Sequence, residues 1–241
     1  MTNVLILLTL PESIRNQYRE RLKRRFPELE INVADHHSKV GPHIGSADAL
    51  ITFAPMLSSK VLTDAKKLKW VQAMGTGVDN LTDQPTLRKD VIVTNIRGIH
   101  GAPVSEAALA SMLALARDLP SAVRAQDARQ WRRFPARLLH NKTVGILGVG
   151  AIAEALAPRC KAFGTHVVGV TATPRKAAGF DRMVSSHDLA AVVGDLDFFV
   201  LLAPLTEKTR NCIDARVLAA MKPTSFLINL EIGRASCRER V

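Results

Sequence analysis

The chain has 241 residues, of which 47% are hydrophobic and 23% are charged, as in a globular protein of one or two domains. This balance excludes disordered, collagen-like and coiled-coil chains, and three cysteines exclude a disulfide scaffold and favour a reducing compartment. The net charge of +11 is compatible with a nucleic-acid partner, a basic surface or the loss of acidic segments. No run approaches the ~20 apolar residues of a membrane span, and no basic segment precedes the apolar run 4–8, as one would in a signal peptide. We therefore expect a cytoplasmic protein without membrane contact.

Short apolar runs alternate with polar helical stretches over the first ninety-odd residues. A helix is expected over Pro11–Phe26, where apolar side chains recur every four residues. The expected strands are Val4–Leu8, Ile31–Val33, Ala49–Phe53, Trp70–Ala73 and Val91–Val93. Strands separated by helical stretches are typical of βαβ units, so the pattern predicts an α/β fold with a parallel sheet.

A long apolar helix is expected between Val104 and Leu119, and its small polar face predicts that it is buried. Ser105 is the expected N-cap, although Pro103 would also allow a start one or two residues earlier. The Arg-rich segment 124–137 follows, and we interpret it as the connection into a second domain.

The second domain begins with a strand and a glycine-rich turn. Its expected strands are Thr143–Leu147, His166–Val170, Arg182–Val184, Leu196–Leu202 and Phe226–Asn229. A helix is expected from the turn to about Phe163, with Gly164 as its C-cap.

The turn Gly148–Ala153 matches the dinucleotide-binding pattern G-x-G-x-x-G/A and lies between a strand and a helix, as the pattern requires. Gly148 allows the tight turn, Gly150 lets the backbone approach a diphosphate, and Ala153 keeps the helix close to the strand. The free N–H groups of the first helical turn would face that diphosphate. The expected diphosphate-binding residues are Gly148, Val149, Gly150, Ala151 and Ile152. The alternative is a glycine-rich turn without a ligand.

The acidic residue that usually binds the ribose of NAD, about 20 residues further on, is absent. Thr171 stands at that position, and Arg175 and Lys176 follow. A carboxylate there would repel a 2′-phosphate, and a neutral residue with nearby cations removes the repulsion. Both NAD and NADP therefore remain open as cofactors, and the alternative for the two cations is a simple solvent-exposed position.

Six ordered segments resemble the D-isomer-specific 2-hydroxyacid dehydrogenases, over almost everything from Val4 to Leu230. The segments are Ala73–Asn80, Val93–Asn95, Ser105–Ala108 with Leu115–Arg117, Lys142–Gly150, Ala203–Thr206 with Thr209 and Arg210, and Met221–Pro223 with Ile228 and Asn229.

The resemblance implies a flavodoxin-like substrate domain over residues 1–100 and an incomplete doubly wound (Rossmann) NAD(P)-binding domain over residues 101–230, with the cofactor in the cleft between them. It implies an NAD(P)-dependent oxidoreductase that interconverts a D-2-hydroxy acid and a 2-oxo acid. The helix from Val104 would begin the second domain or form part of a homodimer interface.

The resemblance also implies site residues. Gly75, Thr76, Gly77 and Val78 look like the substrate loop, in which backbone N–H groups at Gly77 and Val78 would hold the substrate carboxylate. Thr76 would lie beside the nicotinamide end of the cofactor. The expected contacts on the adenosine side of the cofactor are Ala203, Pro204 and Thr209, beside Thr171 and Arg175.

The sequence departs from the family where the chemistry is expected. The family places an Arg three residues after the Asn that matches Asn229, to bind the substrate, and a Glu and an acid–base His further along. Ile232 stands at the Arg position, and Arg234 is offset by two. The seven histidines lie in other segments, where we expect surface or loop positions, at 36, 37, 43, 100, 140, 166 and 187. We therefore expect no catalytic residue and no metal site in this chain, and an inactive fragment.

Residues 231–241 show neither helical nor strand periodicity and read as the translation of a common sequencing adapter, so we expect an artefactual tail. Two other functions compete with the dehydrogenase. A nucleotide-sensing regulatory or corepressor-type member of the same fold would need no catalytic residues. A nucleic-acid binder is disfavoured, because no recognition motif accompanies the basic residues.

Overall fold

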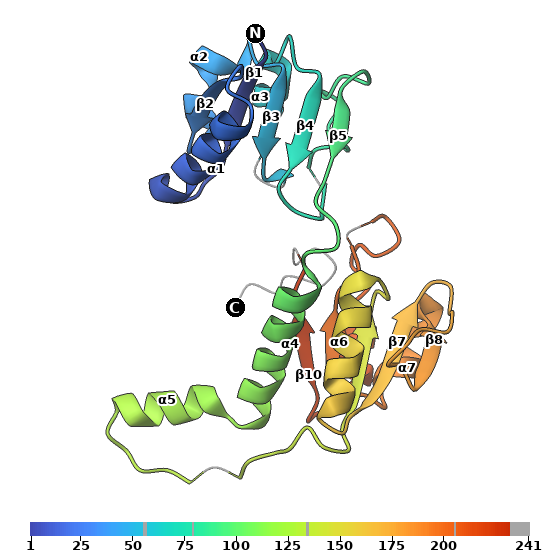
Figure 1. Cartoon of the computed structure of the whole chain (residues 1–241). Coiled ribbons are helices and arrows are strands. Elements are labelled where there is room, and N and C mark those ends of the chain that lie inside the picture. Colours follow the sequence, from blue (N-terminus) through green and yellow to red (C-terminus); the bar gives the residue numbers. More distant parts are fainter. Residues whose placement is uncertain (55–56, 79, 134, 205, 232–241) are drawn as a thin grey trace. The chain divides into compact units, whose positions relative to one another are not determined.

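The computed structural model describes residues 1–54, 57–78, 80–133, 135–204 and 206–231, and it divides into two compact units, Met1–Arg97 and Gly98–Val241 (Figure 1). The expectations for Asp79, Leu205, Ile232, Arg234 and the rest of the tail fall outside the described residues. The Arg-rich segment 124–137 lies within the second unit, so it does not connect the two units as we had interpreted.

The first unit is a five-stranded parallel sheet with helices between its strands. Its strand order is β2-β1-β3-β4-β5, which is the flavodoxin-like order and confirms the expected fold of this unit. Its elements are β1 (Asn3–Leu7), α1 (Glu12–Arg25), β2 (Glu30–Ala34), a short 3-10 helix (His37–Lys39), α2 (Gly41–Ile44), β3 (Ala49–Thr52), α3 (Ser59–Asp64), β4 (Trp70–Ala73) and β5 (Ile92–Thr94).

The core of the first unit forms because its central strands are apolar on both faces. Leu5 and Ile6 are neighbours in β1, and both are 0% exposed although they point to opposite faces. Such unbroken apolar strands are typical of a parallel sheet covered on both sides. Ile44 of α2 and Val61 of α3 pack into the main cluster. By contrast, α1 has no buried residue, and Ile14 on its apolar stripe is 37% exposed.

The second unit is also a five-stranded parallel sheet, with the order β10-β9-β6-β7-β8. Counted from β6, this is the 3-2-1-4-5 order of a doubly wound dinucleotide-binding fold and confirms the expected class. Its elements are α4 (Gly101–Ala116), α5 (Leu119–Asp127), β6 (Thr143–Leu147), α6 (Ala151–Ala162), β7 (His166–Thr171), β8 (Arg182–Ser185), a short 3-10 helix (Ser186–Asp188), α7 (Leu189–Val193), β9 (Phe198–Leu201), α8 (Ala215–Ala220) and β10 (Phe226–Asn229). Among the described residues, β10 pairs only with β9, so its other edge has no strand partner.

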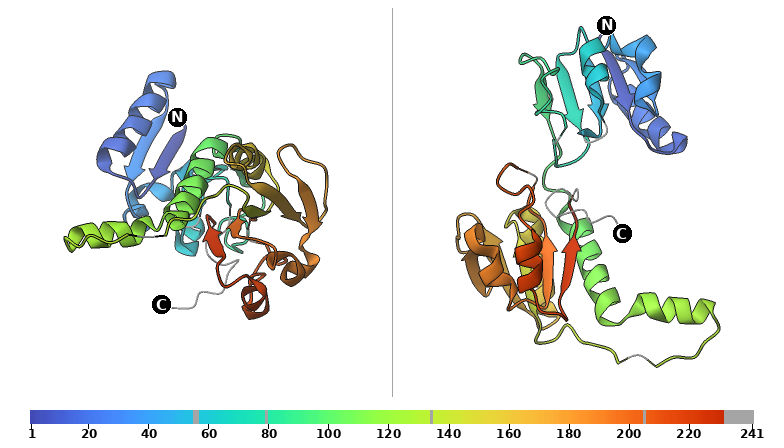
Figure 2. Two further views of the ribbon diagram at one scale, coloured as in Figure 1. Left: turned by 90° about the horizontal axis from the view of Figure 1, so that it is seen from below. Right: turned by 180° about the vertical axis from the view of Figure 1, so that it is seen from behind.

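Two hydrophobic layers cover the sheet of the second unit. Helices α4 and α6 pack on one face, and α7 and α8 pack on the other (Figure 2). Successive residues of β9 alternate between these layers, because neighbouring side chains of a strand point to opposite faces. Phe198 therefore packs with the α4–α6 layer, whereas Phe199 packs with the α7–α8 layer.

The long helix differs from its expected form at both ends. It begins at Gly101, so Ser105 is not the N-cap but is buried inside the helix, where its hydroxyl donates to the Gly101 carbonyl at 2.5 Å. It ends at Ala116, because Asp118 adopts a left-handed conformation (φ 49°) that breaks the helical ladder before α5. Full burial was also a wrong expectation, because Ala107 and Ala110 are exposed and Leu109 is half-buried.

Candidate functional site

Gly148 closes the turn after β6 in a position that only glycine can occupy. Its φ of +93° lies in the left-handed region, and an added Cβ would lie 2.6 Å from both Cα and N of Ala203. Its own N–H donates to the Val170 carbonyl at 2.9 Å. The ends of β6, β7 and β9 are therefore drawn together at one point of the sheet, where the order of the strands reverses.

Gly150 has the opposite environment, since an added Cβ would meet no protein atom within 4 Å. It is the N-cap of α6 with extended backbone (φ −124°, ψ −167°), so its conformation does not require glycine. Its carbonyl accepts from Glu154 N at 2.9 Å, which begins the helical ladder. The first N–H groups of a helix have no intrahelical acceptor. Open space beside such donors fits a diphosphate group.

Ala153 holds helix α6 against the sheet. It is 1% exposed and packs in the same cluster as Val144 and Ile146 of β6. A larger side chain would push the helix away from the strand. The structure thus places Gly148–Ala153 as the dinucleotide-binding pattern requires, with a tight turn, open space and close helix–strand packing.

Thr171 is the last residue of β7. The carboxyl end of this strand lies at the same edge of the sheet as the turn Gly148–Ala153. Beyond it, the Arg175 guanidinium forms an ion pair with Glu154, which lies in the first turn of α6. Sequence reasoning missed this pair, because it depends on the loop after β7 returning along α6. Farther along the loop, Asp181 accepts from Lys161 Nζ at 2.8 Å and from Val167 N at 2.7 Å, and this lysine holds the pKa of Asp181 below its ordinary value.

The segment after β9 is fixed by an internal hydrogen-bond network. Ala203 is buried, and Pro204 beside it is exposed. The Thr209 hydroxyl donates to the Pro204 carbonyl at 2.6 Å and accepts from Thr206 N at 2.7 Å. Because a hydroxyl has one proton, Thr209 shapes this loop rather than offering a donor to a ligand in this arrangement.

The glycine loop of the first unit follows β4, and its carbonyls are tied to the segment after β5. The Gly75 carbonyl accepts from Ile96 N at 3.1 Å, and the Thr76 carbonyl accepts from Asn95 Nδ2 at 2.6 Å. In a trans peptide the C=O and the following N–H point in opposite directions. The Gly77 N–H, which shares a peptide with the Thr76 carbonyl, therefore points away from Asn95. Val78 packs its side chain on the core, which fixes the end of the loop.

Two polar side chains that sequence reasoning missed hold the chain beyond this loop. Asn80 adopts a left-handed conformation (φ 58°) and donates to the Leu57 carbonyl at 2.8 Å. Gln84 is 8% exposed and donates to the carbonyls of Asn80 and Leu57 at 2.6 and 3.0 Å. The signal for Asn80 was available, because Asn is among the residues that tolerate a left-handed turn position.

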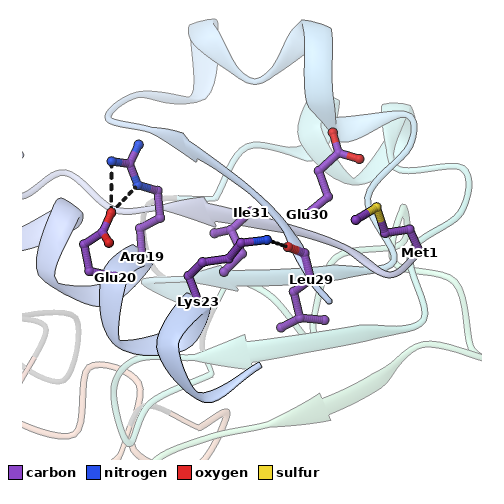
Figure 3. Close-up of a pocket in the computed structure, with 7 residues that line it drawn as sticks. All are labelled: Met1, Arg19, Glu20, Lys23, Leu29, Glu30 and Ile31. Carbon is purple, nitrogen blue, oxygen red and sulfur yellow. Dashed lines mark hydrogen bonds and ion pairs between the residues drawn. The ribbon is translucent and has the colours of Figure 1, made fainter. Parts of the chain in front are cut away.

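The hollow of Figure 3 is not a candidate for the cofactor site. The hollow drawn in Figure 3, of about 330 Å³, is lined by Met1, Lys23, Glu30 and residues near them, at the amino ends of β1 and β2. In a parallel sheet, ligands bind at the carboxyl ends of the strands. A second hollow, of about 150 Å³, lies at the carboxyl ends of β1 and β3 and is lined by Leu7, Thr9, His36, His37, Thr52 and Phe53. None of the seven histidines is buried, and no group of described residues could hold a metal ion. No described helix is long and apolar enough to cross a membrane.

A parallel sheet of 3-2-1-4-5 order with this turn at the point of strand reversal defines a dinucleotide-binding domain. Residues 109–239 match the family described as "D-isomer specific 2-hydroxyacid dehydrogenase, NAD binding domain". The chain therefore belongs to the D-isomer specific 2-hydroxyacid dehydrogenase family. This confirms the resemblance and the expectation of NAD or NADP as the family's cofactor.

Individual relatives agree with the family assignment. D-3-phosphoglycerate dehydrogenase of Methanocaldococcus jannaschii is 30% identical over 86% of this chain, and the match spans 40% of that protein. Glyoxylate reductase of Pyrococcus furiosus is 27% identical over 96% of this chain, and the match spans 71% of that protein. The crystal structure of a D-isomer specific 2-hydroxyacid dehydrogenase family protein from Aeromonas salmonicida has a TM-score of 0.84 and 32% identity, with 98% of this chain and 75% of that chain covered.

Proposed function

We propose that this chain binds NAD or NADP at the turn between β6 and α6, and that it represents an oxidoreductase that interconverts a D-2-hydroxy acid and a 2-oxo acid. The observation that carries the cofactor site is the contrast between two glycines. Gly148 is locked against Ala203, whereas Gly150 opens into free space beside the first turn of α6. The cofactor would accept or donate the hydride, while the protein binds and orients the reactants.

The cofactor contacts of this proposal come from the carboxyl ends of three strands. The diphosphate would lie against the backbone of Gly148–Ile152, because those N–H groups and the positive end of the helix favour an anion. Thr171 and Arg175 would bind the ribose on the adenosine side, and Ala203–Pro204, shaped by Thr209, would border the adenosine.

The substrate's carboxylate would bind to the glycine loop Gly75–Val78. Support comes from the way Asn95 and Ile96 engage the carbonyls of this loop, which turns the Gly77 N–H away from them. Backbone N–H groups in such a turn form a concave site that suits a carboxylate. A 2-hydroxy acid or 2-oxo acid carries this carboxylate next to its reacting carbon, so the loop would place that carbon.

Hydride transfer also needs a proton donor and acceptor at the substrate hydroxyl, and the family uses an Arg, a Glu and a His there. Ile232 stands at the Arg position, and no His or Glu matches within the 241 residues. We therefore propose that this chain binds the cofactor and does not turn over substrate by itself.

The proposal is tested by titrating the 241-residue chain with NADH and NADPH and following the nicotinamide fluorescence. We expect saturable binding of at least one of them, and loss of that binding in the Gly150→Ala variant. Glyoxylate or hydroxypyruvate is then added, and the consumption of the bound reduced cofactor is measured. Binding without consumption supports the proposal, whereas absence of binding to both cofactors contradicts it.

We also propose that the chain forms a homodimer through α4 and α5. Figure 1 shows α5 extending from the end of α4 away from the sheet of its own unit. Apolar side chains on and after these helices are exposed, with Val123 at 54% and Trp131 at 92%. A second copy would bury this surface, because exposed apolar side chains that gather in one region mark contact sites.

Sedimentation velocity tests the dimer. Val123→Glu should shift the chain from dimer to monomer, because an uncompensated charge would be buried in the interface. The control is Ile92→Glu, since Ile92 is 65% exposed and belongs to β5 of the first unit, outside α4 and α5. A wild-type chain that sediments as a monomer, or a dimer unaffected by Val123→Glu, contradicts this proposal.

A further inference from the structure

The glycine loop Gly75–Val78 is joined to the segment that follows β5. Strands β4 and β5 pair in parallel, so both end at the same edge of the sheet. Beyond their ends, the Ile96 N–H donates to the Gly75 carbonyl at 3.1 Å, and Asn95 Nδ2 donates to the Thr76 carbonyl at 2.6 Å. The neighbouring segment therefore sets the directions in which these two carbonyls of the loop point.

The peptide between Thr76 and Gly77 needs such an anchor, because glycine accepts backbone angles that other residues avoid. A half-turn of this peptide plane would put the Thr76 carbonyl where the Gly77 N–H had been, since the two groups point in opposite directions. A donor for a carboxylate would then be replaced by an acceptor, which repels an anion. The hydrogen bond from Asn95 opposes this half-turn, because it holds the carbonyl on its own side of the loop.

Asn95 is itself held in place by the strand end that it follows. The hydroxyl of the preceding Thr94 accepts from Trp70 Nε1 at 2.7 Å and donates to Gln72 Oε1 at 2.8 Å, so two side chains of β4 fix the end of β5. At the other end of the loop, the Val78 side chain packs on the core. The loop is thus fixed at both ends, and Asn95 fixes the peptide between them.

We propose that Asn95 is a positioning residue for the substrate, which holds the peptide between Thr76 and Gly77 so that the Gly77 N–H faces the substrate carboxylate. This inference rests on the proposed substrate loop and names the residue that makes the loop a carboxylate site. The asparagine amide donates to a carbonyl, whereas an aspartate carboxylate of nearly the same shape only accepts. Aspartate at this position would therefore favour the half-turn, because it would repel the Thr76 carbonyl and accept from the Gly77 N–H.

Titration of the 241-residue chain with oxamate, followed by nuclear magnetic resonance, tests the inference. Oxamate has a carboxylate beside a carbonyl, as a 2-oxo acid has, but its amide carbon does not accept a hydride. With NADH present, the backbone amide signals of Gly77 and Val78 should shift saturably. Asn95→Ala should weaken oxamate binding about three- to ten-fold, because it removes one hydrogen bond and lowers the fraction of loops in the binding orientation. Asn95→Asp should weaken it at least about ten-fold, because it favours the opposite orientation.

The affinity for NADH and the stability in urea are measured for each variant, and Asn3→Ala is the matched control. Asn3 Nδ2 donates to the Ser46 carbonyl at 3.2 Å, and Asn3 is the first residue of β1. This variant therefore loses the same kind of hydrogen bond at the opposite edge of the same sheet, and it should bind oxamate as the wild type does. All three variants should bind NADH within about three-fold of the wild type.

The outcomes separate this inference from the proposed function. If Asn95→Ala and Asn95→Asp bind oxamate as tightly as the wild type, the inference is overturned while the proposed substrate loop stands. If both variants lose the binding of NADH as well, or if Asn3→Ala weakens oxamate binding equally, Asn95 has a structural role only and the inference is also overturned. If the Gly77 and Val78 signals of the wild type do not respond to oxamate, the proposed substrate loop is refuted, and this inference with it.

Discussion

The two glycines of the phosphate turn should respond to alanine in opposite ways. At Gly150 the backbone is extended and an added Cβ meets nothing within 4 Å. Replacing a helix N-cap glycine by alanine costs up to about 1 kcal/mol, and the reduced freedom of the unfolded chain returns about 0.4–1 kcal/mol. The unfolding free energy of Gly150→Ala should therefore lie within about 1 kcal/mol of the wild type. The methyl group nevertheless occupies the space in which the diphosphate would approach the backbone.

At Gly148 the same substitution meets backbone. The new Cβ would lie 2.6 Å from Ala203 Cα and N and 2.8 Å from the Leu202 carbonyl carbon, at a φ of +93°. A left-handed conformation costs a non-glycine residue about 1–3 kcal/mol, and overpacking costs about 1–3 kcal/mol more. Gly148→Ala should therefore lower the unfolding free energy by about 2–6 kcal/mol, a large part of the stability of a typical domain.

Urea unfolding followed by circular dichroism and NADPH titration give the two readouts for each variant. We expect Gly150→Ala to be as stable as the wild type and to bind NADPH at least about ten-fold more weakly, which corresponds to about 1.4 kcal/mol. We expect Gly148→Ala to be destabilised. A Gly150→Ala variant that binds NADPH normally would refute the assignment of the open space to the diphosphate. An undisturbed Gly148→Ala variant would refute the close contact between the ends of β6 and β9.

Three further predictions concern stability and reactivity. Asp197→Ala should lower the unfolding free energy by about 1–3 kcal/mol in urea titration, because the carboxylate accepts from the Thr143 N–H at 2.9 Å where β6 begins. Lys161 holds the pKa of Asp181 below its ordinary value of 3.8, so the stability from this carboxylate is present above that value and is lost as the pH falls. The unfolding free energy of Asp181→Asn should therefore change less than that of the wild type between about pH 5 and pH 3. Burial raises the pKa of the Cys160 thiol to about 12, so Cys160 should resist a thiol reagent in the native chain and react after unfolding, as mass spectrometry of labelled peptides would show.

Most strands could be predicted because in both sheets their apolar runs are short and bounded by polar residues. Phe198–Leu201 has all four residues buried, and an apolar run of this length is typical of a strand covered on both faces. The G-x-G-x-x-A turn was predictable for a related reason, since the pattern, the strand before it and the helix after it are local in sequence. Local patterns therefore located the diphosphate turn, which the structure then placed at the point of strand reversal.

The long helix and its continuation depended on contacts that a local pattern does not contain. Ser105 resembles an N-cap, but its hydroxyl is satisfied inside the helix by Gly101, and tertiary packing extends the helix to that glycine. An added Cβ on Gly101 would lie 3.2 Å from the Ala155 Cβ, so α4 and α6 approach each other closely at this point. Helix α5 was missed because it has only nine residues, of which Ala125 alone is buried, so few apolar positions mark a buried face.

The side chains that tune the candidate sites were the least predictable, because each acts across a large distance in sequence. Asn95 holds the Thr76 carbonyl from the next strand end, and Glu154 pairs with Arg175 across the whole of β7. Parallel topology explains both cases, since it brings the carboxyl ends of successive strands to one edge and makes neighbours of loops that are 19 and 21 residues apart. Local motifs therefore identify the backbone turn that is open to a ligand, whereas side-chain pairs that join distant segments, such as Glu154 and Arg175, follow only from the fold. Gly150→Ala changes only the local turn, so it should weaken the binding of NADH and NADPH alike.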